Sequence, residues 1–173
     1  MIYFSWISII RIGLVQMALG SILALTNATL NRIMVVELSL LAIVPGMLIA
    51  LHYAIQITRP NWGLLSDIGG NRTRWIIGGL SILGIGATLA TVGIIVFEKN
   101  FLLGLFVSSI AYGLIGIGVG ASGTSLLALL ATGTQEKQRA LAATITWLMM
   151  IMGAILTAFI VGDLIEPYSH LRL

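Results

Sequence analysis

The stretch NFLLGLFVSSIAYGLIGIGVGASGTSLLALLATGTQ, residues 100–135, holds 36 residues without one charged side chain. A helix rises about 1.5 Å per residue and needs about 20 apolar residues to cross the hydrocarbon core of a bilayer. The stretch is too short for two crossings and a turn, so it predicts one long helix over about residues 101–131 with polar ends. Its backbone must be helical, because lipid offers no partner to an unpaired N–H or C=O group.

Four further charge-free runs of 20 to 23 residues surround this stretch, at residues 12–31, 38–58, 75–97 and 140–162. Each fits one crossing. Only 9% of the residues are charged, whereas soluble domains average about 25%. The sequence therefore predicts an all-α helical bundle with about five transmembrane helices in a lipid bilayer, forming a single transmembrane domain over residues 1–173.

Composition also narrows the class of function. The chain has no cysteine, which excludes a thiolate metal site and a cysteine nucleophile. Its net charge of +3 is scattered singly, so no nucleic-acid partner is expected. No Ser/His/Asp arrangement, metal cluster or paired carboxylates stand out in the sequence, and we do not expect an enzyme.

The lysines and arginines predict the orientation. With a cytoplasmic N-terminus the inner side would hold six of them and the outer side three, which favours N-inside and C-outside. The inner set is Arg11, Arg59, Arg72, Arg74, Lys137 and Arg139, and the outer set is Arg32, Lys99 and Arg172.

Glycines crowd the central stretch. Residues 118–123 match the dinucleotide pattern G-x-G-x-x-G, but that fingerprint needs a preceding strand and a soluble βαβ unit. Gly116 and Gly120 instead form G-x-x-x-G, the small-residue spacing that lets membrane helices approach closely. We therefore interpret both glycines as helix-packing residues.

The polar connection Arg59–Arg74, between the second and third predicted spans, carries the most specific local pattern. It resembles the signature loop of the major facilitator superfamily, G-x-x-x-D-x-x-G-[RK]-x-[RK], with Asn71 as one extra residue. The matching residues are Gly63, Asp67, Gly70, Arg72 and Arg74. An aspartate there can pair with arginines or a helix N-terminus, and such a pair can form and break as helices rock. A generic positive-inside turn would explain the arginines but not the aspartate.

Asn31 ends the first predicted span, and Arg32 and Glu37 lie between the first two spans with four apolar residues between them. Charged residues at membrane depth are costly and usually functional, but an ordinary short loop at the outer interface fits equally well. The spacing of five between Arg32 and Glu37 is not the i,i+4 geometry of a helical ion pair. Both interpretations stay open on the residues alone.

His52 is the one histidine within a predicted span. It could donate a hydrogen bond to a neighbouring helix, or its neutral imidazole could ligate the magnesium of a chlorophyll. Taken by itself, the sequence favours the hydrogen-bonding role.

Pro45-Gly46, earlier in the same span, predicts a kink in that helix.

Several of these segments together are similar to one branch of the major facilitator superfamily, the PucC/LhaA or bacteriochlorophyll-delivery group. The resembling segments are RIGLVQMALG (11–20), LNRIMVVEL (30–38), LHY (51–53), RPNWG (59–63) and SHLRL (169–173). The resemblance implies assembly of light-harvesting complexes in a bacterial inner, photosynthetic membrane, with bacteriochlorophyll or chlorophyll as pigment and antenna polypeptides as partners. It also implies pigment or ligand binding by His52, Asn31, Arg32 and Glu37, which fall on the resembling positions.

The chain departs from that group in its number of spans. Members have about twelve, so five spans would correspond to an N-terminal portion, and alternating access needs two halves around a midplane site. Two alternatives therefore stand beside the assembly role. One is a fragment or half of a solute transporter whose missing spans come from a second chain, and the other is a small structural subunit of a membrane complex.

Overall fold

The structure, a computed structural model, describes residues 3–165, and within this range it consists of helices and short connections. The helices are α1 (Trp6–Ala24), η1 (Leu25–Thr29), α2 (Leu30–Arg32), η2 (Ile33–Glu37), α3 (Ile43–Ile55), η3 (Gln56–Thr58), α4 (Arg59–Ile68), α5 (Arg72–Lys99), α6 (Phe101–Gly133), η4 (Glu136–Gln138) and α7 (Arg139–Ile165). The prediction of an all-helical membrane bundle is confirmed. Four runs of the described chain are long and apolar enough to span a membrane: Trp6–Glu37, Arg72–Lys99, Phe101–Gly133 and Glu136–Ile165.

The first run is one continuous helix from α1 through η2. The Ser5 side chain accepts a hydrogen bond from the Ser8 N–H at 3.4 Å and so caps the start of α1. η1 and η2 are π-helical turns, in which each N–H bonds five residues back. The segment that could have been a loop at Asn31–Glu37 is therefore helical, and the chain leaves the helix only after Glu37.

The second predicted span, 38–58, corresponds to α3, which is shorter than expected. Residues 38–42 are not helical, and Ser39 has a left-handed φ of 51°. α3 has 13 residues, about 20 Å of helix against about 30 Å of hydrocarbon, although the helical run continues through η3 and α4. Pro45 lies in the first turn of α3, where a helix does not need its N–H, so it begins the helix rather than kinking a span.

The expected polar connection Arg59–Arg74 is wrong in its extent, because its first ten residues form α4. Pro60 occupies the start of this helix, where its fixed φ favours helical geometry. Only Gly69, Gly70 and Asn71 link α4 to α5. The residues of the signature pattern are therefore held on two helix ends rather than on an open loop.

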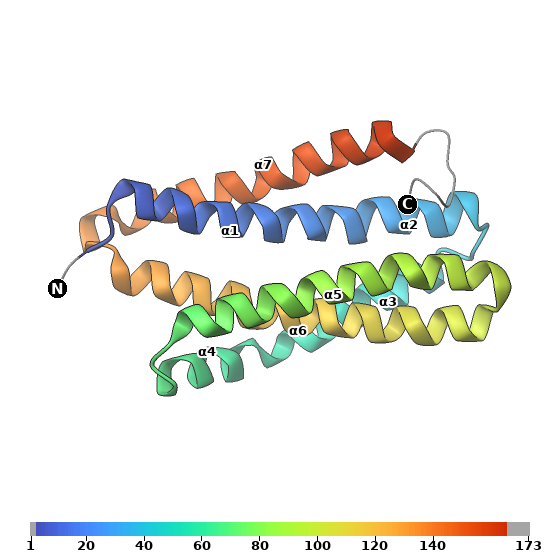
Figure 1. Ribbon diagram of the computed structural model, residues 1–173, viewed down its shortest axis with the longest axis horizontal. Helices are drawn as coiled ribbons and strands as arrows, with labels where there is room; N and C mark the ends of the chain where they lie inside the picture. The colour runs from blue at the N-terminus through green and yellow to red at the C-terminus, as the bar shows by residue number, and fades with distance from the viewer. Residues whose placement is uncertain (1–2, 166–173) are drawn as a thin grey trace.

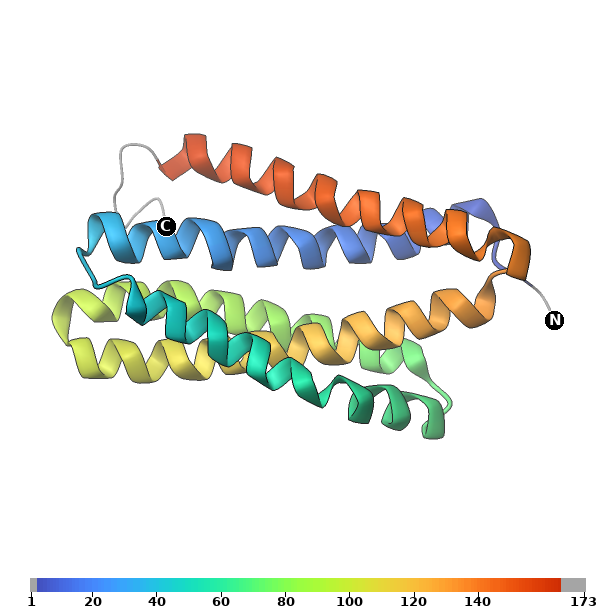
Figure 2. The ribbon, with the colours of Figure 1, turned by 180° about the vertical axis from the view of Figure 1, so that it is seen from behind.

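The helices form two groups, which Figures 1 and 2 show from opposite sides. α1 and α7 lie side by side as one pair. α5 and α6 form a second antiparallel pair, and α3 and α4 pack against α6. α6 thus contacts α5, α3 and α4 and forms the centre of the second group.

Glycines let the α5 and α6 backbones approach closely. A Cβ at Gly79 of α5 would lie 2.6 Å from the Ser122 backbone nitrogen, and one at Gly118 of α6 would lie 2.7 Å from the Leu83 backbone nitrogen. The α1 and α7 backbones also approach closely at a glycine, because Gly153 of α7 faces the Met17 backbone. Close backbone contact between small residues is the usual source of helix association in lipid, where apolar burial adds little.

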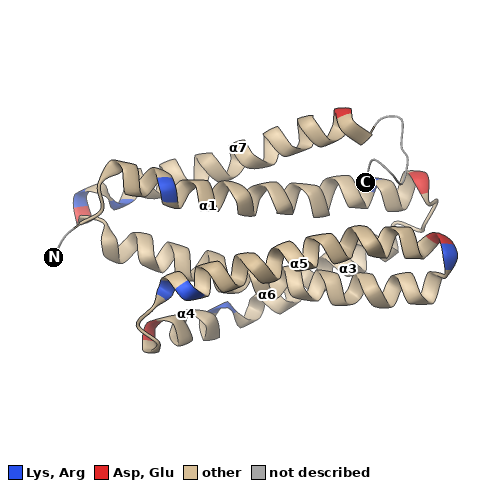
Figure 3. Cartoon of the chain, viewed as in Figure 1, with Lys and Arg blue, Asp and Glu red and all other residues tan. Residues whose placement is uncertain are grey.

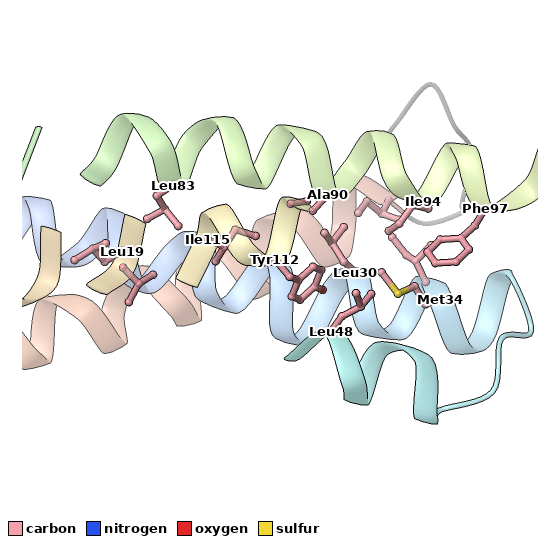
Figure 4. Packing of buried hydrophobic residues seen from close by; sticks show 14 residues of the cluster. Leu19, Leu30, Met34, Leu48, Leu83, Ala90, Ile94, Phe97, Tyr112 and Ile115 are labelled. Atoms are coloured by element: carbon pink, nitrogen blue, oxygen red, sulfur yellow. The ribbon is translucent and has the colours of Figure 1, made fainter. Parts of the chain in front are cut away.

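The main hydrophobic core lies between the two groups and extends from the middle of the bundle to the end opposite the α4–α5 link (Figure 4). Leu30, Met34, Leu48 and Ile94 are buried there around Tyr112. The Tyr112 hydroxyl donates to the carbonyl oxygen of Thr26 in η1 at 2.9 Å. This hydrogen bond satisfies the one polar group of an otherwise apolar cluster and ties α6 to the π-helical turn.

Most charged residues gather toward the two ends of the bundle (Figure 3). Many large apolar side chains are exposed along its sides. Arg72, Arg74, Lys137 and Arg139 belong to the end that carries the α4–α5 link and the α6–α7 turn. The opposite end, at the α5–α6 turn, carries a mixture of acidic and basic residues. This distribution is that of a bundle whose middle lies in lipid.

Candidate functional site

The link between α4 and α5 is a sharp turn built from Gly69, Gly70 and Asn71. The Gly69 N–H donates to the Leu65 carbonyl at 3.0 Å and ends α4. Gly70 has a φ of 62°, a left-handed conformation that glycine adopts without a Cβ clash. The Asn71 side chain then accepts from the Arg74 N–H at 3.3 Å and caps α5. The turn brings the end of α4 next to the start of α5.

The Arg72 guanidinium joins three helices at this turn. Its Nη2 and Nε atoms donate to Asp67 Oδ1 of α4 at 2.7 and 3.0 Å. Its Nη1 atom donates to the Ala128 carbonyl of α6 at 2.9 Å and to the Thr132 hydroxyl. Arg72 therefore connects the end of α4 and the start of α5 to the last turns of α6.

This ion pair is poorly placed to add stability. Asp67 lies near the C-terminus of α4 and Arg72 is the first residue of α5, so both charges oppose the dipole of their own helix. The Arg72 and Asp67 side chains are 22% and 54% exposed, and such pairs contribute at most about 1 kcal/mol. A weak, specific contact between helix ends suits a group that forms and breaks during a conformational change.

The other members of the predicted signature divide into two sets. Gly63 of α4 faces α6, where its Cβ would lie 3.3 Å from Thr124 Cγ2, so it belongs to the same helix junction as the ion pair. Arg74 is exposed and lines a separate, mainly apolar pocket of about 420 Å³ with Trp62 and Trp75. The structure thus brings Gly63 and the ion pair to one junction and leaves Arg74 outside it.

His52 is enclosed between helices. Its side chain is 1% exposed, and its Nε2 atom lies 2.6 Å from the Gln56 side-chain amide, one turn further along the helix. Nδ1 has no hydrogen-bond partner among the described residues. A pigment could reach this ring only if α3 moved relative to its neighbours, and the role of His52 in pigment binding stays a prediction.

Asn31, Arg32 and Glu37 lie on a different helical run from His52. Asn31 and Arg32 are in α2, and Glu37 is the last residue of η2. Within the described chain, no hydrogen bond or ion pair connects Asn31 or Glu37 to His52. Arg32 and Glu37 are five residues apart, a spacing that argued against an α-helical ion pair. In a π-helical turn the hydrogen-bonded residues are five apart, so this spacing matches η2. Sequence reasoning missed both π turns, and this spacing was a signal for η2 alone.

Gly116 and Gly120 lie where α6 crosses the helical run of α3 and α4. A Cβ at Gly116 would be 2.8 Å from the His52 carbonyl oxygen, and one at Gly120 would be 3.3 Å from Trp62 Cδ1. Both glycines therefore sit at close approaches between helices.

Sequence reasoning also missed the position of Arg59, which it counted with the other cytoplasmic arginines. The Arg59 side chain lies against Gly120, where a Cβ would be 3.8 Å from Arg59 Cγ. Gly120 precedes Ala128, the residue that Arg72 contacts, by eight residues or about 12 Å of helix. Arg59 thus begins deeper in the bundle than the ion pair. The sequence could not show this, because α4 continues the helix beyond the charge-free run.

These features define a polytopic, all-helical integral membrane protein in which one arginine joins three helix ends at the basic end of the bundle. A family model described as "PUCC protein" matches residues 29–173, and the chain belongs to this family.

Relatives in purple bacteria agree with that assignment. The chain is 55% identical over 168 residues, 97% of its length, to the "Bacteriochlorophyll synthase 44.5 kDa chain" of Rhodobacter capsulatus, of which the match covers 39%. It is 28% identical to "Protein PucC" of Rhodobacter capsulatus and 28% identical to that of Cereibacter sphaeroides, over 95% of the chain and 38% and 39% of those proteins. The chain therefore spans about two-fifths of the length of these relatives. No solved structure matches it.

Proposed function

We propose that the chain is part of a membrane protein that handles bacteriochlorophyll and assists the assembly of light-harvesting complexes. Membership of the PUCC family is the observation that carries this proposal. The 55%-identical relative, whose name refers to bacteriochlorophyll, supports it. Antenna polypeptides would be the protein partners, and the site of action would be a bacterial inner, photosynthetic membrane. The proposed role is binding and transfer rather than catalysis.

In this proposal the Asp67–Arg72 contact, which we call the latch, holds the helices in one conformation until it breaks. Opening it would release α4 and the start of α5 from the last turns of α6, since Arg72 is the residue that bonds to both. Gly63 would let α4 slide on α6, because it places no side chain at that contact.

The pigment would be bound through His52, with Asn31, Arg32 and Glu37 contributing to a ligand or partner surface. The unpaired Nδ1 atom of His52 is unfavourable in a buried ring, and it would bind a metal once the proton moves to Nε2 and the Gln56 side chain turns its amide oxygen toward that atom. Because the ring is enclosed, binding would follow the opening of the latch and the separation of α3 from α6.

Purification in mild detergent from a photosynthetic host tests the proposal. We expect bacteriochlorophyll, seen by absorption, and antenna polypeptides, seen by mass spectrometry, to accompany the protein. The absence of both would refute the assembly role. His52→Leu should lower the pigment retained, whereas Met47→Leu, at an exposed position of the same helix, should not. Unchanged pigment in His52→Leu would reject His52 as a ligand.

The Asp67–Arg72 contact also favours a second candidate, a solute transporter of the major facilitator type that is completed by a second chain. Alternating access needs two halves, so this candidate requires a partner that supplies further spans. A neighbouring reading frame encoding six or seven spans would favour it. Asp67→Asn should impair the function of an assembly factor or a transporter, because both would change conformation through this contact. The function of a purely structural subunit should be unaffected.

A further inference from the structure

A small, partly open pocket lies between the two helix groups, with the exposed side chains of Arg59 and Trp147 in its wall. It has a volume of about 160 Å³, and its wall includes Gln16 and Leu23 of the first run, Arg59 of α4, Thr124 of α6, and Trp147 and Met150 of α7. Most of the lining is apolar. Its polar side chains are therefore few and confined, which is the usual composition of a ligand site.

Arg59 gives this pocket a positive charge. Among the described residues its guanidinium makes no hydrogen bond and no ion pair. Its side chain begins about 12 Å deeper along α6 than the residue that Arg72 contacts. The Arg59 side chain is exposed and lines the pocket from its rim, and an unpaired arginine at membrane depth commonly marks a ligand or ion site.

Gln16 supplies a second, independent observation. Its side chain is 4% exposed, and its amide Nε2 donates only to the weak acceptor Met150 Sδ at 3.4 Å. Its Oε1 atom has no hydrogen-bond partner in the described chain. A buried amide left unsatisfied costs about 1–3 kcal/mol. One pocket therefore holds both an unpaired cation and an incompletely bonded amide.

We propose that this pocket binds the oxyanion group, carboxylate or phosphate, of an amphipathic molecule whose apolar part lies among the helices or in lipid. The guanidinium fork of Arg59 would hold the oxyanion, and Gln16 Nε2, whose one acceptor among the described residues is the weak Met150 Sδ, would donate a further hydrogen bond to it. A cavity of about 150 Å³ is known to hold a molecule the size of benzene. At about 160 Å³ the pocket accommodates the charged end and a short part of the chain, and not a tetrapyrrole ring. The proposal does not depend on the pigment-handling role.

Binding of paired probes to the purified chain in detergent tests this site. Radiolabelled palmitate is compared with hexadecanol, and phosphatidylglycerol with diacylglycerol, so that one member of each pair lacks the oxyanion. We expect an anionic probe to bind at least about tenfold more tightly than its partner, as a charged hydrogen bond would require. Preference for palmitate would identify a free carboxylate as the ligand, and preference for phosphatidylglycerol a lipid phosphate. Equal binding within both pairs would overturn the proposal.

Two variants connect the binding to this pocket. Arg59→Gln should weaken binding of the anionic probe about tenfold, whereas Lys137→Gln, at an exposed basic position outside the pocket, should leave it unchanged. Gln16→Glu nearly preserves the shape of the pocket but adds a carboxylate that competes for Arg59, so it should weaken binding to a similar degree. Thermal unfolding of each variant in the same detergent identifies any loss caused by misfolding. Unchanged binding in either folded pocket variant would also overturn the proposal.

Discussion

At the scale of single residues, two neighbouring glycines of α5 differ sharply in their surroundings. A Cβ at Gly79 would lie 2.6 Å from the Ser122 nitrogen and 2.9 Å from the Gly118 carbonyl oxygen, and neither backbone atom can move without shifting α6. We therefore expect Gly79→Ala to destabilise the protein by about 1–3 kcal/mol, the usual cost of overpacking. Denaturant unfolding in detergent, followed by circular dichroism, measures this loss.

Gly78 provides the matched control. A Cβ at Gly78 would have no atom within 4 Å, so Gly78→Ala adds a methyl group without a clash. Alanine is also favoured over glycine in a helix by about 0.5–1 kcal/mol, so this variant should be unchanged or slightly more stable. Equal destabilisation of both variants would mean that the close α5–α6 contact does not govern stability.

At the scale of elements, the π-helical turn η1 distinguishes the first membrane run from a plain α-helix. A π turn holds one more residue than an α turn, so deleting one residue there can restore an α-helix while both flanks keep their faces. We expect deletion of the exposed Ala28 to be tolerated, at a cost of about 1 kcal/mol if the hydrogen bond from Tyr112 to Thr26 is lost. Size-exclusion chromatography and thermal unfolding in detergent test this.

Deletion of Ala18, an exposed residue in the α-helical part of the same run, is the control. Ala18 lies in a regular α-helical turn, which does not contain the additional residue of a π turn. The deletion would turn every later residue by about 100° relative to α7 and so separate Gly20 from the Met150 backbone. Ala18 deletion should abolish the folded peak, and equal tolerance of both deletions would contradict the special role of η1.

The helices also show which parts of the fold could be predicted from the sequence. The predicted spans 75–97, 101–131 and 140–162 lie within α5, α6 and α7, because lipid forces a long uncharged run to be helical. α4 was missed because its arginine, proline and asparagine resemble a loop, although Pro60 sits where a helix begins. The Asp67–Arg72 pair could be expected from its spacing. The depth of Arg59 could not, since it depends on how α4 continues and packs on α6.

At the scale of the whole molecule, the two ends of the bundle differ in charge. At the end with the α4–α5 link and the α6–α7 turn, Arg72, Arg74, Lys137 and Arg139 outnumber Asp67 and Glu136, whereas at the other end Glu37, Glu98 and Asp163 outnumber Arg32 and Lys99 (Figure 3). Lysine and arginine are enriched in cytoplasmic loops of membrane proteins. We therefore propose that the basic end, and with it the start of α1, faces the cytoplasm.

The lack of cysteine makes this orientation directly measurable, because each introduced cysteine is the sole thiol of the sequence. Gln135→Cys places a thiol in the α6–α7 turn, and Lys99→Cys places one at the α5–α6 turn; both positions are exposed. A membrane-impermeant maleimide should label Gln135→Cys only in inside-out vesicles and Lys99→Cys only in right-side-out vesicles. The parent chain, which has no thiol, gives the background. The reverse pattern would place the basic end outside, and labelling of both variants from one side would show that α6 does not cross the membrane.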